Sequence, residues 1–438
     1  MSNTPFGFGR PGDDGDDENP NPTPAGFGQG GDMQQFADML RQFADMLSSQ
    51  GGSGGEGPLN WDLAKSIARH TVVEKGDPSV VDAEARQVQE ALRLAELWLD
   101  EGTTLPAGIR TPQAWSRSEW IENTLPVWSK VVDPVAARMV ESMSSSMPED
   151  MAAMAGPLVG MIRQMGGAMV GSQAGQALGT LAQEVVGSAD VGLPLAPEGV
   201  GALLPAGVAA FGSGLEVPED EVRLYLALRE AAHQRLFAHV PWLRAHLLGA
   251  VEEYARGITM DLSGIEEAVA GLDLSNPEAL QQALGGEIQL QPEDTPQQKA
   301  ALVRLETALA LVEGWVETVV NGTASSRLPG TVKLTEAVRR RRATGGPAEH
   351  TFATLVGLEL RPRRLREAAA LWRVLTEARG IDGRDAIWEH PDLLPTAGDL
   401  DDPDAFVYGK HVDLDISQLT DTPEPDKSDD SGSGDGKA

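Results

Sequence analysis

The sequence predicts a mainly α-helical fold with a small β-hairpin or edge strands, and three observations support this prediction. Apolar residues recur at helical spacing through much of the span 59–411. Several segments begin with the Thr-Pro or Asn-Pro pairs that are typical of helix starts. The exception is 189–211, where short apolar runs are broken by proline and suit extended segments or an edge hairpin. The hairpin or strands would therefore lie just before the helix predicted at 219–237.

The composition fits a folded cytoplasmic protein. With 41% hydrophobic residues, a chain of 438 residues can bury a sizeable core. The absence of cysteine excludes disulfides and thiolate metal sites, and it fits a reducing compartment. The first residues form no secretory signal, and no apolar run is long enough to be a transmembrane segment. A net charge of -31 argues against nucleic acid as a partner.

Both ends of the chain are predicted to be disordered, because they are acidic and rich in Gly, Pro and Ser (1–58 and 412–438). A short amphipathic helix at 31–49 interrupts the first of them. It contains the repeat QFADML, whose seven-residue period places six apolar side chains on one stripe: Phe36, Met39, Leu40, Phe43, Met46 and Leu47. Such a short helix is marginal in water. We therefore expect it to dock on a protein partner or on the body of the same chain.

The segment from 59 to about 146 is predicted to be helical, with helix starts at Asp77-Pro78 and Thr111-Pro112. Its tryptophans suit core packing better than a ligand cage. They are Trp61, Trp98, Trp115, Trp120 and Trp128.

A glycine face follows in the segment 151–187. Four glycines recur at every fourth position: Gly167, Gly171, Gly175 and Gly179. In a membrane this pattern would indicate a helix-dimerisation surface. Polar residues interrupt the segment, so we expect a close helix–helix contact inside a water-soluble core.

The helix predicted at 219–237 carries the polar residues of greatest interest. Pro218 and three acidic residues mark its start. Arg229, Glu230 and His233 then interrupt its apolar face at spacings that bring them together. Burial of these groups is costly unless they pair with one another or with a ligand.

The later part of the chain adds carboxylates and arginines. Helices are predicted to begin at Asn276-Pro277 and at Thr295-Pro296, and the second runs to about Val320. Glu313 borders its apolar stripe. The run Arg339–Arg342 suits either a phosphate-binding patch or pairing with acidic groups of the same chain.

Several stretches resemble the zincin-like metallopeptidase family of high-GC Gram-positive bacteria. The similarity spans roughly 60–410, and it is carried by the stretches 230–243, 311–317, 339–349, 381–385 and 388–392. The resemblance implies a zincin-like helical domain and a zinc-dependent hydrolase that acts on peptides or proteins. It also implies that Glu230 is the general base, that His233 binds zinc, and that Glu313 is a further metal ligand.

The chain departs from that family at Arg229, where H-E-x-x-H would have its first histidine. An arginine cannot donate a lone pair to a metal. Zinc held by His233 and Glu313 would lack one of the three protein ligands normal for catalytic sites. We therefore take Glu230 and Arg229 as the candidate catalytic residues, with Arg229 deciding between two hypotheses.

The first hypothesis is a zinc-dependent metallopeptidase, with His239 or His246 considered as the missing ligand. The second is a catalytically inactive zincin-like protein, in which Arg229 replaces the charge of the metal and the protein acts in binding or regulation. A third arrangement would place a metal among Glu230, His233, Glu313 and Glu317, as in carboxylate–histidine sites of helical bundles.

Overall fold

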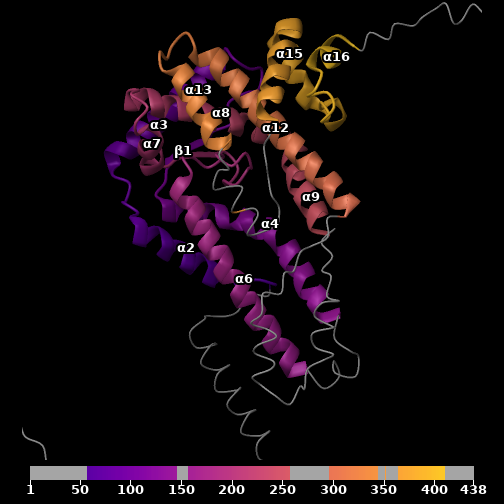
Figure 1. Cartoon of the computed structure of the whole chain (residues 1–438). Coiled ribbons are helices and arrows are strands. Elements are labelled where there is room, and N and C mark those ends of the chain that lie inside the picture. The colour runs from indigo at the N-terminus through magenta and orange to yellow at the C-terminus, as the bar shows by residue number, and fades with distance from the viewer. Residues whose placement is uncertain (1–56, 146–155, 257–294, 344–350, 352–363, 410–438) are drawn as a thin grey trace, which may run out of the picture. The chain divides into compact units, whose positions relative to one another are not determined.

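The computed structural model describes residues 57–145, 156–256, 295–343, 351 and 364–409 (Figure 1). These residues form α-helices, two short strands and two short 3-10 helices, so the predicted mainly α-helical class is confirmed. The predicted docking helix at 31–49 with its six apolar residues, the helix start at Asn276-Pro277 and the acidic tail lie outside the described residues. The elements are α2 (Trp61–Lys75), α3 (Asp82–Leu99), β1 (Thr111–Ala114), α4 (Arg117–Ser145), α6 (Gly156–Glu184), β2 (Val200–Leu203), α7 (Pro205–Gly212), α8 (Glu219–His239), α9 (Leu243–Arg256), α12 (Pro296–Ala324), α13 (Thr331–Ala343), α15 (Leu365–Asp385), η1 (Ala386–Glu389), η2 (Pro391–Leu393) and α16 (Pro403–Tyr408).

An edge strand does precede α8, but it is not part of a hairpin. β2 pairs in parallel with β1, in a register that runs from Thr111 opposite Val200 to Ala114 opposite Leu203. The helix start predicted at Thr111-Pro112 is therefore wrong. Proline is tolerated in this strand because a two-stranded sheet has only edge strands, whose outer N–H positions need no ladder partner.

The second half of the predicted extended segment is helical. Pro205 occupies the first turn of α7, where the missing N–H of proline has no intrahelical partner to lose. Leu204 precedes it in an extended conformation. The proline that was expected to break the segment instead marks the boundary between β2 and α7.

Asp77 caps a different helix from the one the sequence predicts. α3 begins only at Asp82, so the helix start predicted at Asp77-Pro78 is wrong. The Asp77 carboxylate instead accepts the backbone N–H groups of Arg117 (2.9 Å) and Ser118 (3.0 Å) at the start of α4. Because a carboxylate stabilises the free N–H groups of a helix start, Asp77 ties the segment before α3 to α4.

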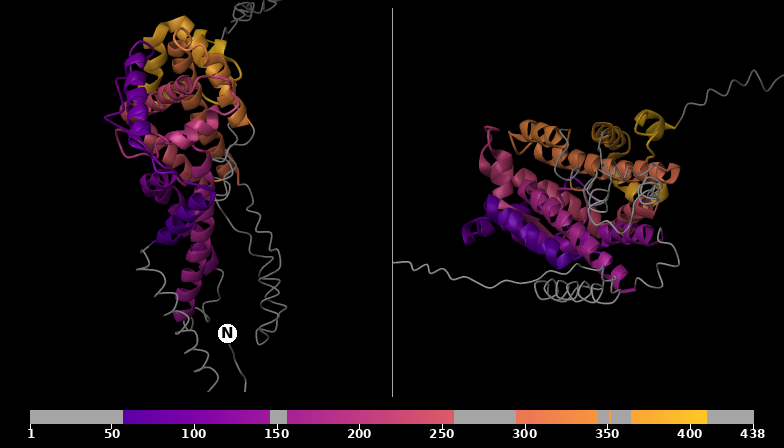
Figure 2. Two further views of the ribbon diagram at one scale, coloured as in Figure 1. Left: turned by 90° about the vertical axis from the view of Figure 1, so that its left-hand side faces the viewer. Right: turned by 60° about the horizontal axis from the view of Figure 1, so that its bottom comes forward.

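The glycine face of α6 packs directly on α2, as predicted, and the two helices lie side by side in both views of Figure 2. A Cβ atom added at Gly175 would lie 2.6 Å from the Ala64 carbonyl oxygen. One added at Gly171 would lie 2.8 Å from the Asn60 carbonyl oxygen. Any larger residue would therefore force the helices apart. None of the helices in the described ranges has an apolar stretch long enough to cross a membrane.

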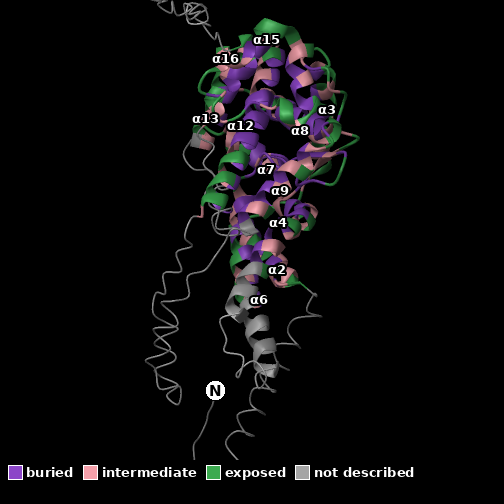
Figure 3. Ribbon diagram, turned by 90° about the vertical axis from the view of Figure 1, so that its right-hand side faces the viewer, coloured by how far each residue is buried: buried purple, intermediate pink, exposed green. Residues whose placement is uncertain are grey.

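The core lies where α8 meets α3, α7 and α12. Residues 225–236 of α8 are buried without interruption, and buried residues also line α12 (Figure 3). α12 begins as predicted, with Thr295 accepting from the Gln298 N–H in a capping box. Trp115, Trp120 and Trp128 are buried in the core, whereas Trp61 and Trp98 pack at its edge.

Asp385 joins the end of α15 to a distant part of the chain. Its buried carboxylate accepts from the Thr103 hydroxyl (2.6 Å), the Thr104 N–H (2.8 Å), Trp315 Nε1 (2.9 Å) and Arg384 Nε (2.7 Å). Burial opposes its ionisation, but Arg384 and these hydrogen bonds hold the pKa of Asp385 below its usual range. The carboxylate therefore fixes the loop after α3 against both α12 and α15.

Candidate functional site

The residues singled out on α8 and α12 meet at one buried carboxylate, that of Glu313. Arg229 Nη2 lies 2.7 Å from Glu313 Oε2. On the other oxygen, Oε1, His233 Nε2 lies at 2.9 Å and Arg342 Nη2 at 2.7 Å. Glu313 is 3% exposed, His233 2% and Arg229 6%. Cationic side chains from α8 and α13 therefore surround a single carboxylate of α12.

Both ring nitrogens of His233 face oxygen acceptors. Nδ1 lies 2.8 Å from the Arg229 carbonyl oxygen, which can only accept, so Nδ1 donates. Nε2 lies 2.9 Å from Glu313 Oε1. The His233 ring is therefore held between the backbone of its own helix, α8, and the carboxylate of α12.

The electrostatics of the cluster follow from burial and these contacts. Burial opposes ionisation of Glu313, but Arg342, His233 and Arg229 together hold its pKa well below the usual range. Burial alone would lower the pKa of Arg229, but Glu313, Tyr225, Glu317 and Asp190 raise it above its ordinary value. Glu313 and Arg229 are therefore a fully ionised buried pair.

A second carboxylate, that of Asp190, compensates the positive charge of Arg341 and Arg342. Arg341 Nη2 lies 2.9 Å from Asp190 Oδ2, which also accepts the Val186 N–H at 3.0 Å. The Asp190 backbone carbonyl accepts from Arg342 Nη2 at 3.0 Å. Burial raises the pKa of Asp190, but Arg341 and Arg342 outweigh it and keep the pKa below its ordinary value. Arg342 therefore bridges Asp190 and Glu313.

Glu230 lies on the same helix but has different partners. Its carboxylate accepts from the Ser188 hydroxyl, the Ala189 N–H (3.0 Å) and Gln234 Nε2 (3.0 Å). Among the described residues no hydrogen bond joins it to His233 or Glu313. Burial raises its pKa above the usual range despite these donors. Glu230, the predicted general base, is therefore buried and hydrogen-bonded to residues of its own chain.

The loop between α6 and β2 closes over both carboxylates at two glycines. A Cβ atom at Gly187 would lie 2.7 Å from Glu230 Oε2. Gly192 has a φ of 77°, and a Cβ atom there would lie 3.2 Å from Glu313 Oε1. The loop therefore requires small residues at both contacts, and at Gly192 it also uses a conformation that favours glycine.

The residues present do not fit a zinc ion. No cluster of three His, Asp or Glu side chains suited to a metal occurs among the described residues. His233 Nε2 and Glu313 Oε1 lie 2.9 Å apart, whereas two tetrahedral ligands at normal zinc distances would lie about 3.3 Å apart. Both oxygens of Glu313 are also paired with guanidinium groups. A metal bound to Glu313 would have to displace both arginines.

The other residues considered as metal ligands have their own contacts. His239 Nε2 lies 3.1 Å from the Ala107 carbonyl oxygen, and the His246 ring packs edge-on against Trp242. Glu317 pairs with Arg339 of α13. None of these three contacts His233 or Glu313 in the hydrogen bonds and ion pairs of the described residues, so none supplies the ligand that Arg229 replaces.

Sequence reasoning missed the residues that complete the cluster: Ser188, Asp190, Gln234 and Arg342. One signal for Arg342 was present. Arg339 and Arg342 are three apart on α13, and Glu317 and Glu313 are four apart on α12, so one helical face of each can supply two ion pairs. The pairing of the arginine run with acidic groups of the same chain agrees with one of its two expected uses.

Comparisons with known proteins agree with this fold. Residues 59–407 match a family model described as "Zincin-like metallopeptidase". A solved structure described as "a putative hydrolase with a novel fold from Chloroflexus aurantiacus" superposes with a TM-score of 0.58. The match covers 80% of this chain and 98% of that one at 20% sequence identity, so it shows a shared fold alone. No curated protein matches the chain.

Proposed function

Because the chain belongs to the zincin-like metallopeptidase family, we propose that it is a catalytically inactive member in which arginine charge replaces the metal. The observation that carries the proposal is the pair of guanidinium contacts on Glu313. Arg229 occupies one carboxylate oxygen at 2.7 Å and Arg342 occupies the other at 2.7 Å. Arginine stays protonated in proteins and suits paired recognition of a carboxylate, so it is a permanent substitute for a cation.

The state of Glu230 supports the same proposal. A zincin general base must face a water molecule beside the metal. Here Glu230 is 4% exposed and its carboxylate accepts three donors of its own chain, so it is a buried group that is already hydrogen-bonded. Glu230 acts instead as a structural group that holds the loop at Ser188 and Ala189 against α8.

The proposal is tested by metal content. Protein incubated with excess zinc and then desalted should contain only trace zinc by elemental analysis. The double substitution Arg229→His with Arg342→Gln should acquire near-stoichiometric zinc, because it removes both guanidinium groups and restores a third donor. Adding His233→Ala to that variant should abolish the gain. Near-stoichiometric zinc in the unmodified protein, lost on His233→Ala alone, would overturn the proposal.

A second candidate is a zinc-dependent hydrolase that acts on peptides, and one observation favours it. His233 Nδ1 donates to the Arg229 carbonyl oxygen, and metal-binding histidines commonly donate their other N–H to a carbonyl in this way. This candidate predicts hydrolysis of an unfolded protein such as casein that stops when a chelator is added. Equal, background hydrolysis with and without the chelator would favour the inactive protein.

A binding role would involve the amphipathic helix that the sequence predicts at 31–49. Its six apolar residues would form the face that docks on a partner. Deletion of 31–49 should leave the melting temperature unchanged while abolishing capture of a specific partner from the native host. A large fall in melting temperature would show instead that the helix packs on the body of its own chain.

A further inference from the structure

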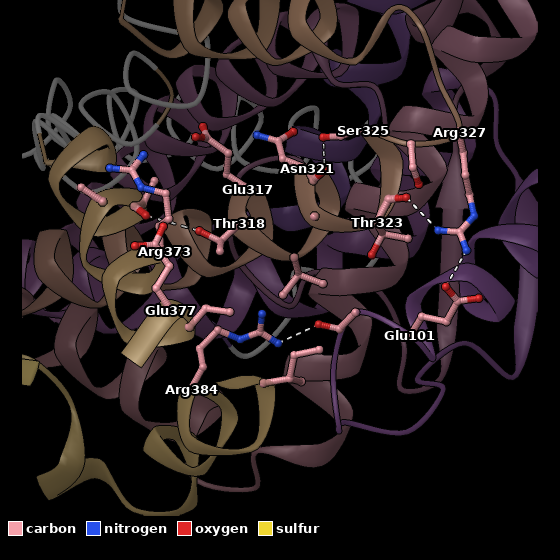
Figure 4. Close-up of a pocket in the computed structure, with 18 of the residues that line it drawn as sticks. Glu101, Glu317, Thr318, Asn321, Thr323, Ser325, Arg327, Arg373, Glu377 and Arg384 are labelled. Carbon is pink, nitrogen blue, oxygen red and sulfur yellow. Dashed lines mark hydrogen bonds and ion pairs between the residues drawn. The ribbon is translucent and has the colours of Figure 1, made fainter. Parts of the chain in front are cut away.

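A pocket of about 600 Å³ lies beside the C-terminal half of α12 (Figure 4). One face of α15, the turn after α3 and Arg339 of α13 complete its walls. This volume is in the range of small-molecule sites. The residues of the Glu313 cluster do not line this pocket: Arg229, His233, Glu313 and Arg342. A ligand in the pocket is therefore independent of the proposed function.

Arginine dominates the charged lining of this pocket, on a chain whose net charge is -31. Most of these side chains already have acidic partners. Arg327 pairs with Glu101 at 2.6 Å, Arg339 with Glu317, and Arg384 with Asp385. The five arginines in the lining are Arg327, Arg339, Arg366, Arg373 and Arg384, and the three glutamates are Glu101, Glu317 and Glu377.

Arg366 and Arg373 are the two arginines of the pocket for which the described part of the chain supplies no ion pair or hydrogen bond. They are seven residues apart in α15, so they lie on the same helical face. Ala369 and Ala370, which lie between them and also line the pocket, are small. Two unpaired guanidinium groups therefore border one open volume.

The opposite wall offers neutral polar groups. Thr318 and Asn321 of α12 line it, together with Ser325 at the end of this helix. Thr323 also lines the pocket, is 3% exposed, and has a hydroxyl for which no hydrogen-bond partner exists among the described residues. A buried hydroxyl without a partner is rare in proteins and indicates a group that water or a ligand satisfies.

We propose that this pocket binds a small molecule that carries one oxyanionic group, a phosphate or a carboxylate. Arg366 and Arg373 pair with the anion, because guanidinium groups bind both oxyanions through paired hydrogen bonds. The hydroxyl and amide groups of α12 bind the uncharged part of the molecule. Glu101 and Glu317 are neutralised by Arg327 and Arg339. Arg366 and Arg373 together with Glu377 then leave a small positive charge in the lining, which suits a single anionic group.

Isothermal titration with inorganic phosphate and, separately, with acetate tests the proposal, at constant ionic strength maintained with NaCl. We expect saturable binding of at least one probe, and the one that binds more tightly identifies the class of anion. Arg366→Ala with Arg373→Ala should weaken that binding by at least about tenfold, the ratio that corresponds to about 1.4 kcal/mol. Both residues are exposed, so the variant should keep its melting temperature.

The matched control is Arg86→Ala with Arg93→Ala. These two arginines are also exposed and seven residues apart on a helix, α3, and neither lines the pocket. The control removes the same net charge at the same spacing and should leave binding within about twofold. The proposal is overturned if neither probe binds saturably, or if the control weakens binding as much as the double substitution in the pocket.

Discussion

Replacement of Arg229 by alanine tests whether this arginine substitutes structurally for a metal. Among the described residues, Arg229 is the cation that contacts Glu313 Oε2, and its side chain is 8% exposed. Removing one member of a buried ion pair typically costs about 3–5 kcal/mol. Glu313 would keep Arg342 and His233 on its other oxygen, so we expect the lower end, about 3 kcal/mol. In a domain of this size that loss corresponds to a fall in melting temperature of roughly 5 °C.

Differential scanning calorimetry at neutral pH measures this effect. The control is Arg110→Ala, because Arg110 pairs with Glu198 on the surface, where the side chains are 71% and 86% exposed. Surface pairs contribute little, so the free energy of unfolding of the control should stay within about 0.5 kcal/mol of the unmodified protein. Arg229→Met preserves most of the buried aliphatic volume and isolates the loss of charge. If both Arg229 variants are as stable as the control, the guanidinium does not replace a metal charge.

Four further predictions concern Glu230, Glu313, Asp385 and Gly175. Burial raises the pKa of Glu230. Its stabilising effect relative to Glu230→Gln should therefore be full below its unfolded pKa of about 4.3 and should shrink as the pH rises above that value. The arginines and His233 lower the pKa of Glu313. The melting-temperature advantage of the unmodified protein over Glu313→Gln should therefore be full at neutral pH and shrink as the pH falls below about 4.3. Identical pH profiles for Glu230→Gln and Glu313→Gln would contradict these opposite pKa shifts. Asp385→Asn should lower the free energy of unfolding by about 3 kcal/mol in urea denaturation, because it breaks the buried ion pair with Arg384 and disturbs the hydrogen bonds that the carboxylate accepts. A loss below about 1 kcal/mol would refute this account. Gly175→Ala should destabilise the protein by about 1–3 kcal/mol in the same assay through overpacking, whereas Gly249→Ala, at a helical glycine with open space around it, should stabilise it by up to about 1 kcal/mol.

The sequence was sufficient for features that depend on local spacing. The helix after Thr295-Pro296 and the glycine face of α6 follow from short-range patterns, and both are present. The meeting of His233 with Glu313 was expected from the family resemblance and is also present. Local spacing encodes a helix face, and this is why the predictions for α12 and α6 hold.

The errors concern partners that are distant in sequence. The partner of β2 is a strand that precedes α4, and a parallel pair leaves no turn signal that would reveal it. Asp77-Pro78 has the sequence of a helix start, but tertiary packing brings the carboxylate to the start of α4. Arg342 was visible only as part of an arginine run, since its contact with Glu313 depends on how α13 packs.

The contact between Thr103 and Asp385 has a consequence for biosynthesis. The two residues are 282 positions apart, and the Asp385 carboxylate also satisfies the buried indole N–H of Trp315. At typical translation rates of about 5–20 residues per second, on the order of 15–60 s separate the synthesis of the two partners. During that interval the loop after α3 lacks its native partner. The face of α12 that contacts α15 lacks its cover from the synthesis of α12 until that of α15. The growing chain therefore presents apolar surface to chaperones until α15 has left the ribosome.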